Sequence, residues 1–193
     1  EASLSLLDQL EAQGLLDQER GLVHCSGAWS DELPAPGFDP ARPRARDLWT
    51  SGQAQIFTAV SPEMRQEFEL DYAKPWFSRF GLVYYGCCEP LDRQIGVIRG
   101  IPHVRKISMS PWVDVERGAR EIGGDFVFSR KPSPAFLARD VWSPGAVEQD
   151  LRETLEACRR HGCPVEFILK DISTVRYEPR RLWEWAEVAR RVV

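Results

Sequence analysis

The chain has 193 residues, of which 43% are hydrophobic, and it carries a formal net charge of −4 with a sequence pI of about 5.5. This hydrophobic content is enough for a folded core, whereas the acidic balance argues against a nucleic-acid-binding surface, which needs clustered positive charge. No apolar run approaches the roughly 20 residues of a membrane helix, and no signal peptide is visible, so we expect no membrane partner. Five cysteines without a CxxC spacing do not indicate a disulfide framework, and a reducing cytoplasm is the expected location.

The first fifty residues combine one helical pattern with a long stretch rich in proline. Leucines at a spacing of three predict a helix over residues 1–14. The short apolar run 21–26 predicts a strand that delivers His24 and Cys25 near its end. Residues 27–52 contain four prolines and are predicted to be mostly loop. A loop of this length in a compact domain often has a function, such as a lid.

A strand is predicted over 54–58, followed by a helix with a clear start signal. Ser61 is a suitable N-cap for this helix, and a proline and a glutamate follow it. Met64, Phe68 and Tyr72 recur one turn apart, so we expect them to form the buried face of the helix. The Lys74-Pro75 pair should kink or end it.

The stretch from Leu82 to Asp92, LVYYGCCEPLD, is the centre of the predicted architecture. It reads as a strand over 82–86 that turns at a glycine into a helix starting near Pro90. Cys87, Cys88 and Glu89 therefore lie where a strand ends and a helix begins, which in α/β folds is the edge that usually carries the chemistry. The alternative is that the two cysteines are small apolar residues that close a core.

The second half of the chain alternates strand and helix signals. Helices are predicted around Val115 to Ile122, from Ser143 onward, and from Pro179 to near the end. Strands are predicted at 104–108, 125–129 and 165–169.

This alternation predicts parallel strands with right-handed crossovers in a single domain, residues 1–193. A closed (β/α)8 TIM barrel usually needs about 250 residues. We therefore expect an incomplete barrel of about five or six parallel strands, or a small open sheet. The chain begins at Glu1 without an initiator methionine, as a fragment or a processed product would. The unpaired strand edges of an incomplete barrel predict a homodimer, exchange of elements, or coverage of the edges by loops of the chain itself.

Polar and ionisable residues follow most of the predicted strands, and parallel strands should bring them to one rim. Glu89, Lys131, Lys170 and Asp171 are the candidate catalytic residues, because two cations near carboxylates could hold an anionic substrate. The alternative for the lysines is that they only cap carbonyl groups or pair with Asp171. The other members of the rim are Cys25, Cys88, Ser108 and Arg130, together with the candidate substrate-binding residues His24, Gln55, Ser110 and Trp112. Cys87 is the candidate metal ligand, and zinc is the expected metal. Glu89 could be a second ligand, and a third would come from another strand.

Several segments, in order and register, resemble the uroporphyrinogen decarboxylase superfamily, which includes the corrinoid-dependent methyltransferases. Val60-Ser61-Pro62-Glu63-Met64, then Glu67-Phe68 and Tyr72-Ala73-Lys74-Pro75, look like the helix that follows a barrel strand in this family. Val83-Tyr84-Tyr85-Gly86-Cys87 falls where methyltransferase members carry a His-x-Cys zinc motif, with Tyr85 at the position of the histidine. Leu169 to Ile172 occupy the place of a later cysteine or histidine of the family.

The resemblance covers most of residues 50–193 and implies the C-terminal part of a (β/α)8 barrel with its site at the C-terminal strand ends. It implies a methyltransferase-type enzyme that acts on a small substrate with a corrinoid-carrying partner protein and with zinc as a cofactor. The alternatives are decarboxylation of uroporphyrinogen in tetrapyrrole biosynthesis, a lyase reaction in which cations hold carboxylates, and a non-catalytic partner-binding subunit on a degenerate barrel.

Overall fold

The computed structural model describes residues 1–17 and 21–193, which form two compact units. Unit 1 consists of Glu1–Cys87 and Gln94–Ile107, and unit 2 consists of Cys88–Arg93 and Ser108–Val193. Within the described residues, five strands form one sheet in the order β3-β4-β5-β6-β7. The pairs β3–β4, β4–β5 and β6–β7 are parallel, as the alternation of strands and helices predicts.

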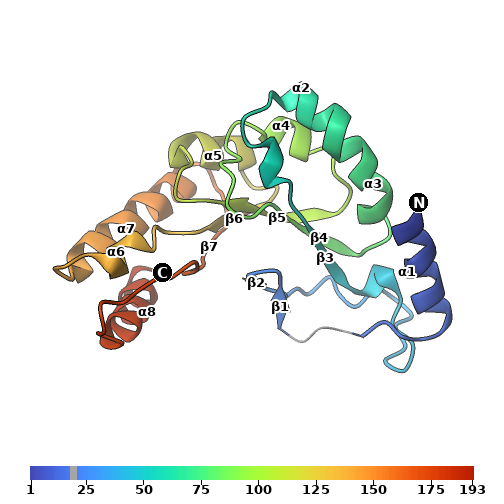
Figure 1. Ribbon diagram of the computed structural model, residues 1–193, viewed down its shortest axis with the longest axis horizontal. Coiled ribbons are helices and arrows are strands. Elements are labelled where there is room, and N and C mark those ends of the chain that lie inside the picture. Colours follow the sequence, from blue (N-terminus) through green and yellow to red (C-terminus); the bar gives the residue numbers. More distant parts are fainter. Residues whose placement is uncertain (18–20) are drawn as a thin grey trace. The chain divides into compact units, whose positions relative to one another are not determined.

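Unit 1 is built on strands β3 (Trp49–Gly52) and β4 (Leu82–Tyr85) and on most of β5 (Val104–Met109). One face of these strands is covered by a helical segment and by the short helix α4 (Ile95–Ile98) (Figure 1). The helical segment comprises α2 (Pro62–Arg65), a π-helical turn (Gln66–Leu70) and α3 (Asp71–Phe77). The opposite face carries the hairpin of β1 (Leu22–Val23) and β2 (Ser26–Gly27), and helix α1 (Ala2–Ala12) begins the chain. All four residues of β4 are buried, as expected for a parallel strand covered on both faces.

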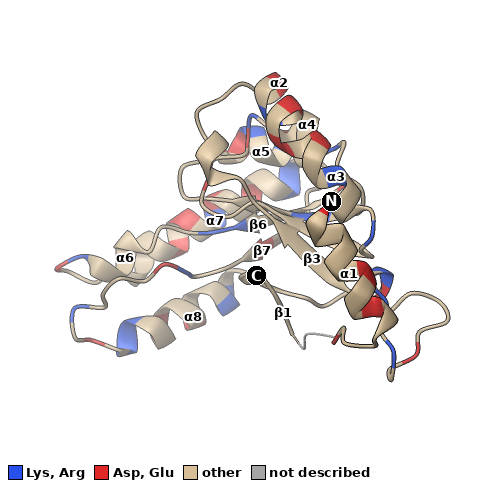
Figure 2. Ribbon diagram, turned by 45° about the vertical axis from the view of Figure 1, so that its right-hand side comes forward, with Lys and Arg blue, Asp and Glu red and all other residues tan. Residues whose placement is uncertain are grey.

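Unit 2 contains β6 (Val127–Arg130) and β7 (Val165–Phe167) with their connecting helices. The helices are α5 (Val115–Ile122), α6 (Ala135–Ala138), α7 (Pro144–Arg160) and α8 (Arg180–Val192). The core lies between α6, α7 and α8 and includes Leu137, Val147, Leu151, Leu155, Trp185, Val188 and Val192. Acidic and basic residues are interspersed along α7 and α8 (Figure 2), for example in the i,i+4 pair of Arg152 with Glu148.

The strand predicted over 54–58 and part of the loop predicted over 27–52 are wrong. Residues 54–58 contain a 3-10 turn, Gln55–Phe57, instead of a strand, and the side chain of Ile56 is 87% exposed. The strand of this region is β3, which lies inside the stretch 27–52 that was predicted to be a long loop. Residues 49–52 form a strand because they pair in parallel with β4, from Leu82 to Tyr85.

The predicted strand 21–26 is also corrected, because it forms an antiparallel hairpin with two residues in each strand. His24 lies in its turn with a positive φ of 53°, so the chain reverses at the place where the prediction continued it. The helix predicted from Pro90 begins only at Ile95, although Leu91, Ile95 and Ile98 are buried as expected.

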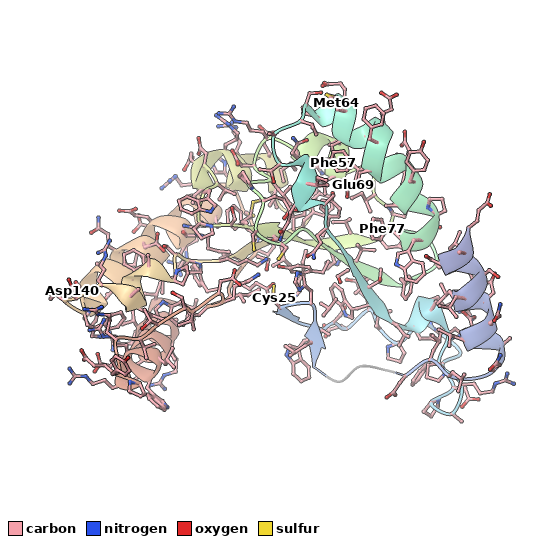
Figure 3. The ribbon with its side chains drawn as sticks, viewed as in Figure 1. Cys25, Phe57, Met64, Glu69, Phe77 and Asp140 are labelled. Carbon is pink, nitrogen blue, oxygen red and sulfur yellow. The ribbon has the colours of Figure 1, made fainter. Side chains whose placement is uncertain are left out.

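The predicted buried stripe of the 62–77 helix is exposed. Met64, Phe68 and Tyr72 are 45%, 51% and 79% exposed. The helix instead buries Arg65, Leu70 and Phe77. Figure 3 shows Met64 on the outer side of this helix, with Glu69 and Phe77 toward the sheet of unit 1. α3 ends at Phe77, soon after the Pro75 that was expected to kink or end it.

Closure into a TIM barrel, the single domain and the homodimer stay predictions. The described sheet ends at β3 and β7. None of the helices in residues 1–17 and 21–193 combines the length and hydrophobicity that crossing a bilayer requires.

Candidate functional site

The side chains of Cys88, Lys170 and Asp171 meet within unit 2. The Lys170 Nζ atom lies 3.5 Å from the Cys88 Sγ atom and 3.2 Å from Asp171 Oδ2. The thiol of Cys88 donates to the same Asp171 oxygen over 3.5 Å. Cys88 and Asp171 are exposed, whereas the Lys170 side chain is only 16% exposed. A thiol, an ammonium group and a carboxylate therefore meet at the surface, where a small molecule can reach the sulfur.

Local backbone geometry positions this cluster. Lys170 and Asp171 follow the end of β7, as the strand pattern predicts. Asp171 has a φ of 57°, in the left-handed region that aspartate tolerates better than most residues. Such conformations occur often at functional sites, where the surrounding structure maintains them.

The chemistry of the cluster follows from its charges. An ammonium group in contact with a thiol favours the thiolate, which is the nucleophilic form of cysteine. The Asp171 carboxylate can accept the thiol proton, and it also balances the charge of Lys170. An anionic ligand could displace Asp171 from Lys170, because both compete for the same ammonium group.

Lys131 and Arg130 of the predicted rim are buried in unit 2. The Lys131 ammonium donates to Ser108 Oγ at 2.5 Å, and Arg130 Nη1 donates to the carbonyl of Ser110 at 2.6 Å. Arg130 also pairs with Asp150 at 3.5 Å. Burial lowers the pKa of Arg130 and raises the pKa of Asp150, and their mutual attraction partly offsets both shifts. These cations therefore support the strand ends instead of facing solvent.

The structure separates the other predicted residues by exposure. Cys87 and Glu89 are buried, and so is Ser110, whereas Trp112 is exposed. Their predicted roles in catalysis, metal binding and substrate binding stay predictions.

In unit 1, His24 and Cys25 lie on the hairpin and contact Tyr84. The ring centroids of His24 and Tyr84 are 5.9 Å apart in an edge-on arrangement, and Cys25 Sγ lies 3.5 Å from the Tyr84 hydroxyl. Gln55, assigned to the predicted rim, is exposed in the 3-10 turn. The substrate-binding roles of His24 and Gln55 also stay predictions.

Sequence reasoning missed the buried Lys106 of unit 1. Its ammonium donates to Ser26 Oγ at 2.9 Å and to the Gly27 carbonyl at 2.6 Å, and it lies 5.7 Å from the ring centre of Trp49. The alternation of VRKISM places Lys106 on the same side of the strand as Val104, which was the available signal.

A second missed feature is the network around Tyr85. Arg65 Nη1 donates to the Tyr85 hydroxyl at 2.9 Å and to Glu69 Oε2 at 3.1 Å, and Arg65 Nη2 donates to the Phe57 carbonyl at 3.1 Å. The Tyr85 hydroxyl donates to Glu69 Oε1 at 2.5 Å. Burial, followed by the hydrogen bond to Glu69, raises the pKa of Tyr85. Tyr85 thus belongs to a polar network that attaches the 62–77 helix to the sheet.

The donor set does not fit zinc. Across residues 1–17 and 21–193, no three His, Cys, Asp or Glu side chains gather as metal ligands would. Cys88 and Asp171 supply two donors beside a cation, whereas a protein zinc site usually has three or four ligands. We therefore derive no step through zinc, and metal binding stays a prediction.

The chain was compared with known proteins at the level of families and of curated sequences. No family model matches it, and no curated protein matches it. The function therefore has to be argued from the site.

Proposed function

We propose that the chain is a uroporphyrinogen decarboxylase-like enzyme, of the methyltransferase type, that acts on a small anionic substrate through the Cys88 thiol. The observation that carries this proposal is the contact of the exposed thiol with both Lys170 and Asp171. The strand-end position of Lys170 and Asp171 supports it, because parallel α/β folds place their active sites there. The corrinoid partner and the substrate class come from the family resemblance.

The three side chains have separate roles in this mechanism. Asp171 takes the thiol proton, and Lys170 stabilises the resulting thiolate. The Cys88 thiolate then takes the proton of the substrate's own thiol, and the substrate sulfur attacks the methyl carbon of an activated donor, whose bond to that carbon breaks with its electron pair remaining on the donor. Lys170 also attracts the anionic group of the substrate. A corrinoid on a partner protein, when bound, supplies a metal centre that exchanges methyl groups.

Decarboxylation is the second candidate, because a thiol that donates protons lies beside a cation. Lys170 would hold a substrate carboxylate and stabilise the charge that develops as carbon dioxide leaves. The Cys88 thiol would then protonate the carbon, and water would restore the thiol proton. This reaction needs no cofactor.

The test is a methyl-transfer assay with free methylcobalamin as donor and 2-mercaptoethanesulfonate as the small anionic thiol. We expect the whole chain to accelerate the loss of methylcobalamin absorbance. Cys88→Ser and Lys170→Met should each remove that acceleration, because they remove the base that takes the substrate's thiol proton and the cation that holds the substrate. Cys25→Ser is the matched control, since Cys25 is another accessible cysteine but lies in unit 1.

The outcomes separate the candidates. Acceleration by the wild type that survives in Cys88→Ser would overturn the role of the thiol. Absence of acceleration would overturn methyl transfer, and release of carbon dioxide from uroporphyrinogen would then support the second candidate. Melting temperatures close to the wild-type value would show that the variants are folded, as expected for the exposed Cys88.

A further inference from the structure

Two cysteines meet where helix α7 ends. The helix stops at Arg160, and Gly162 adopts a positive φ of 63°, which glycine takes without strain. The Cys163 N–H then donates to the carbonyl of Cys158 at 2.8 Å. This six-residue closure is the hydrogen bond of a Schellman motif, in which the side chains of the two bonded residues usually touch.

The two residues that this backbone hydrogen bond joins are both free cysteines, at positions where apolar side chains are usual. Cys158 is 0% exposed and Cys163 is 6% exposed. The Cys163 thiol also lies 3.6 Å from the Pro164 carbonyl, to which it donates. The turn thus brings the two cysteines together at the end of the helix without a covalent bond.

We propose that Cys158 and Cys163 are an oxidation site that forms a disulfide by exchange with a low-molecular-weight disulfide such as oxidised glutathione. The argument does not depend on the proposed function, because neither cysteine belongs to the Cys88 cluster. A disulfide needs two cysteines whose backbones lie close together, and the hydrogen bond of the Schellman turn joins these two backbones before any oxidant arrives. Helix ends open more readily than helix centres, which gives the oxidant access to the less buried sulfur.

The exchange has two steps, and Cys163 reacts first. The hydrogen bond from the Cys158 thiol lowers the pKa of Cys163, and the same contact raises the pKa of Cys158. The Cys163 thiolate attacks one glutathione sulfur, forms a mixed disulfide and releases one glutathione thiolate. Cys158 then gives its proton to a glutathione thiolate and attacks the Cys163 sulfur, which releases the second glutathione. The two protein thiols are oxidised, and the oxidant is reduced to two thiols.

The disulfide would join the end of α7 to the residue before Pro164, which leads into β7. Oxidation would therefore add a covalent constraint immediately before the strand that precedes Lys170 and Asp171. The link closes a short loop that the native turn already forms, so we expect the fold to accept it without rearrangement.

The test uses the whole native chain, oxidised glutathione as the probe, and mass spectrometry as the readout. Trypsin cuts after Arg159, Arg160 and Lys170, so the two cysteines fall on different peptides. We expect a linked pair of these peptides, a loss of two hydrogen atoms beside any glutathione mass added at the exposed cysteines, and restoration of both thiols by dithiothreitol. In Cys158→Ser, the glutathione adduct on Cys163 should persist, because no second thiol displaces it.

Two results would overturn the proposal. One is a stable glutathione adduct on Cys163 of the wild-type chain. The other is that both thiols stay free when the exposed Cys88 is already modified, since Cys88 reports that the oxidant was active. Because the wild-type measurement needs no substitution, the result does not depend on the folding of a variant.

Discussion

The 62–77 helix of unit 1 and helix α7 of unit 2 carry the same kind of apolar stripe, but only α7 buries it. In α7, Val147, Leu151 and Leu155 recur every four residues and lie in the core of unit 2. In the 62–77 helix, Met64, Phe68 and Tyr72 have the same spacing and face outward. Periodicity thus identifies an apolar stripe correctly, but it does not say what the stripe packs against.

The difference lies in what each helix offers to its own unit. α7 buries mainly apolar side chains, with Thr154 as a buried polar residue, and α8 supplies a matching apolar face. The 62–77 helix instead inserts Arg65, whose guanidinium finds Glu69, Tyr85 and the Phe57 carbonyl as partners. A buried cation is costly unless it is paired and hydrogen-bonded, and these partners satisfy most of its donors. A polar network that is complete enough can therefore determine which face of a helix is inside.

The largest effect is expected from removal of the Arg65 guanidinium, which anchors the 62–77 helix. Arg65→Ala leaves the Glu69 carboxylate and the Tyr85 hydroxyl without their cation, and we expect a loss of about 4 kcal/mol in the free energy of unfolding. Chemical denaturation followed by circular dichroism measures this loss. A cost below about 1 kcal/mol would mean that Arg65 does not anchor the helix.

The corresponding change in unit 2 is Leu151→Ala, which removes the centre of the α7 stripe. Leu151 is fully buried, so we expect a cost of about 3 kcal/mol from lost transfer energy and from the cavity that remains. The same denaturation experiment applies, with Leu151→Met as a control that nearly preserves the volume. Equal stability of the alanine variant and the wild type would contradict the assigned core.

Alkaline pH should affect the two helices differently, because it titrates Tyr85 in the network that anchors the 62–77 helix. The pKa of Tyr85 is raised in the folded state, so the folded protein binds the phenol proton more tightly than the unfolded chain does. The resulting stabilisation is complete below the ordinary tyrosine pKa of about 10 and is lost as the pH rises from there through the folded value. Tyr85→Phe should show a shallower loss of stability above that pH than the wild type. Parallel pH profiles of the two proteins would refute the assignment.

The smallest effect is expected on the exposed stripe. Phe68→Ala should change the free energy of unfolding by no more than about 0.5 kcal/mol, because the side chain is half exposed. Leu151→Ala provides the contrast, since the two substitutions remove large apolar side chains from the same relative position of two helices. A cost for Phe68→Ala that approaches that of Leu151→Ala would show that Phe68 is buried in solution.

Much of the parallel sheet could be predicted, because its central strands are local apolar runs. Residues 82–85 and 104–109 form strands close to the predicted bounds, and so do 127–130 and 165–167. β3 was missed because Trp49 to Gly52 follow a proline-rich stretch and are only partly buried. Its strand character comes from pairing with β4, a contact between residues more than thirty positions apart, which periodicity cannot report.

The sequence singled out most residues of the candidate site but did not predict which side chains contact each other. The strand-end rule singled out Lys170 and Asp171 together with the two adjacent cysteines, and the structure brings Cys88 to Lys170. Adjacent side chains in an extended or turning chain point in different directions, so one backbone turn decides which thiol is exposed. The burial of Lys131 was not predictable either, because it depends on a hydrogen bond to Ser108 on another strand.

The 62–77 helix contains a π-helical turn at Gln66–Leu70. A π turn is wider than an α turn by one residue, so it resembles an insertion that the helix has absorbed without breaking. In an α-helix each residue advances the direction of its side chain by about 100°, so an extra residue taken up as plain α-helix would rotate Arg65 relative to Phe77 by that angle. The π turn takes up the extra residue locally, and Arg65 and Phe77 are both buried. Deletion of one residue within the π turn should therefore be tolerated better than deletion of one residue elsewhere in this helix.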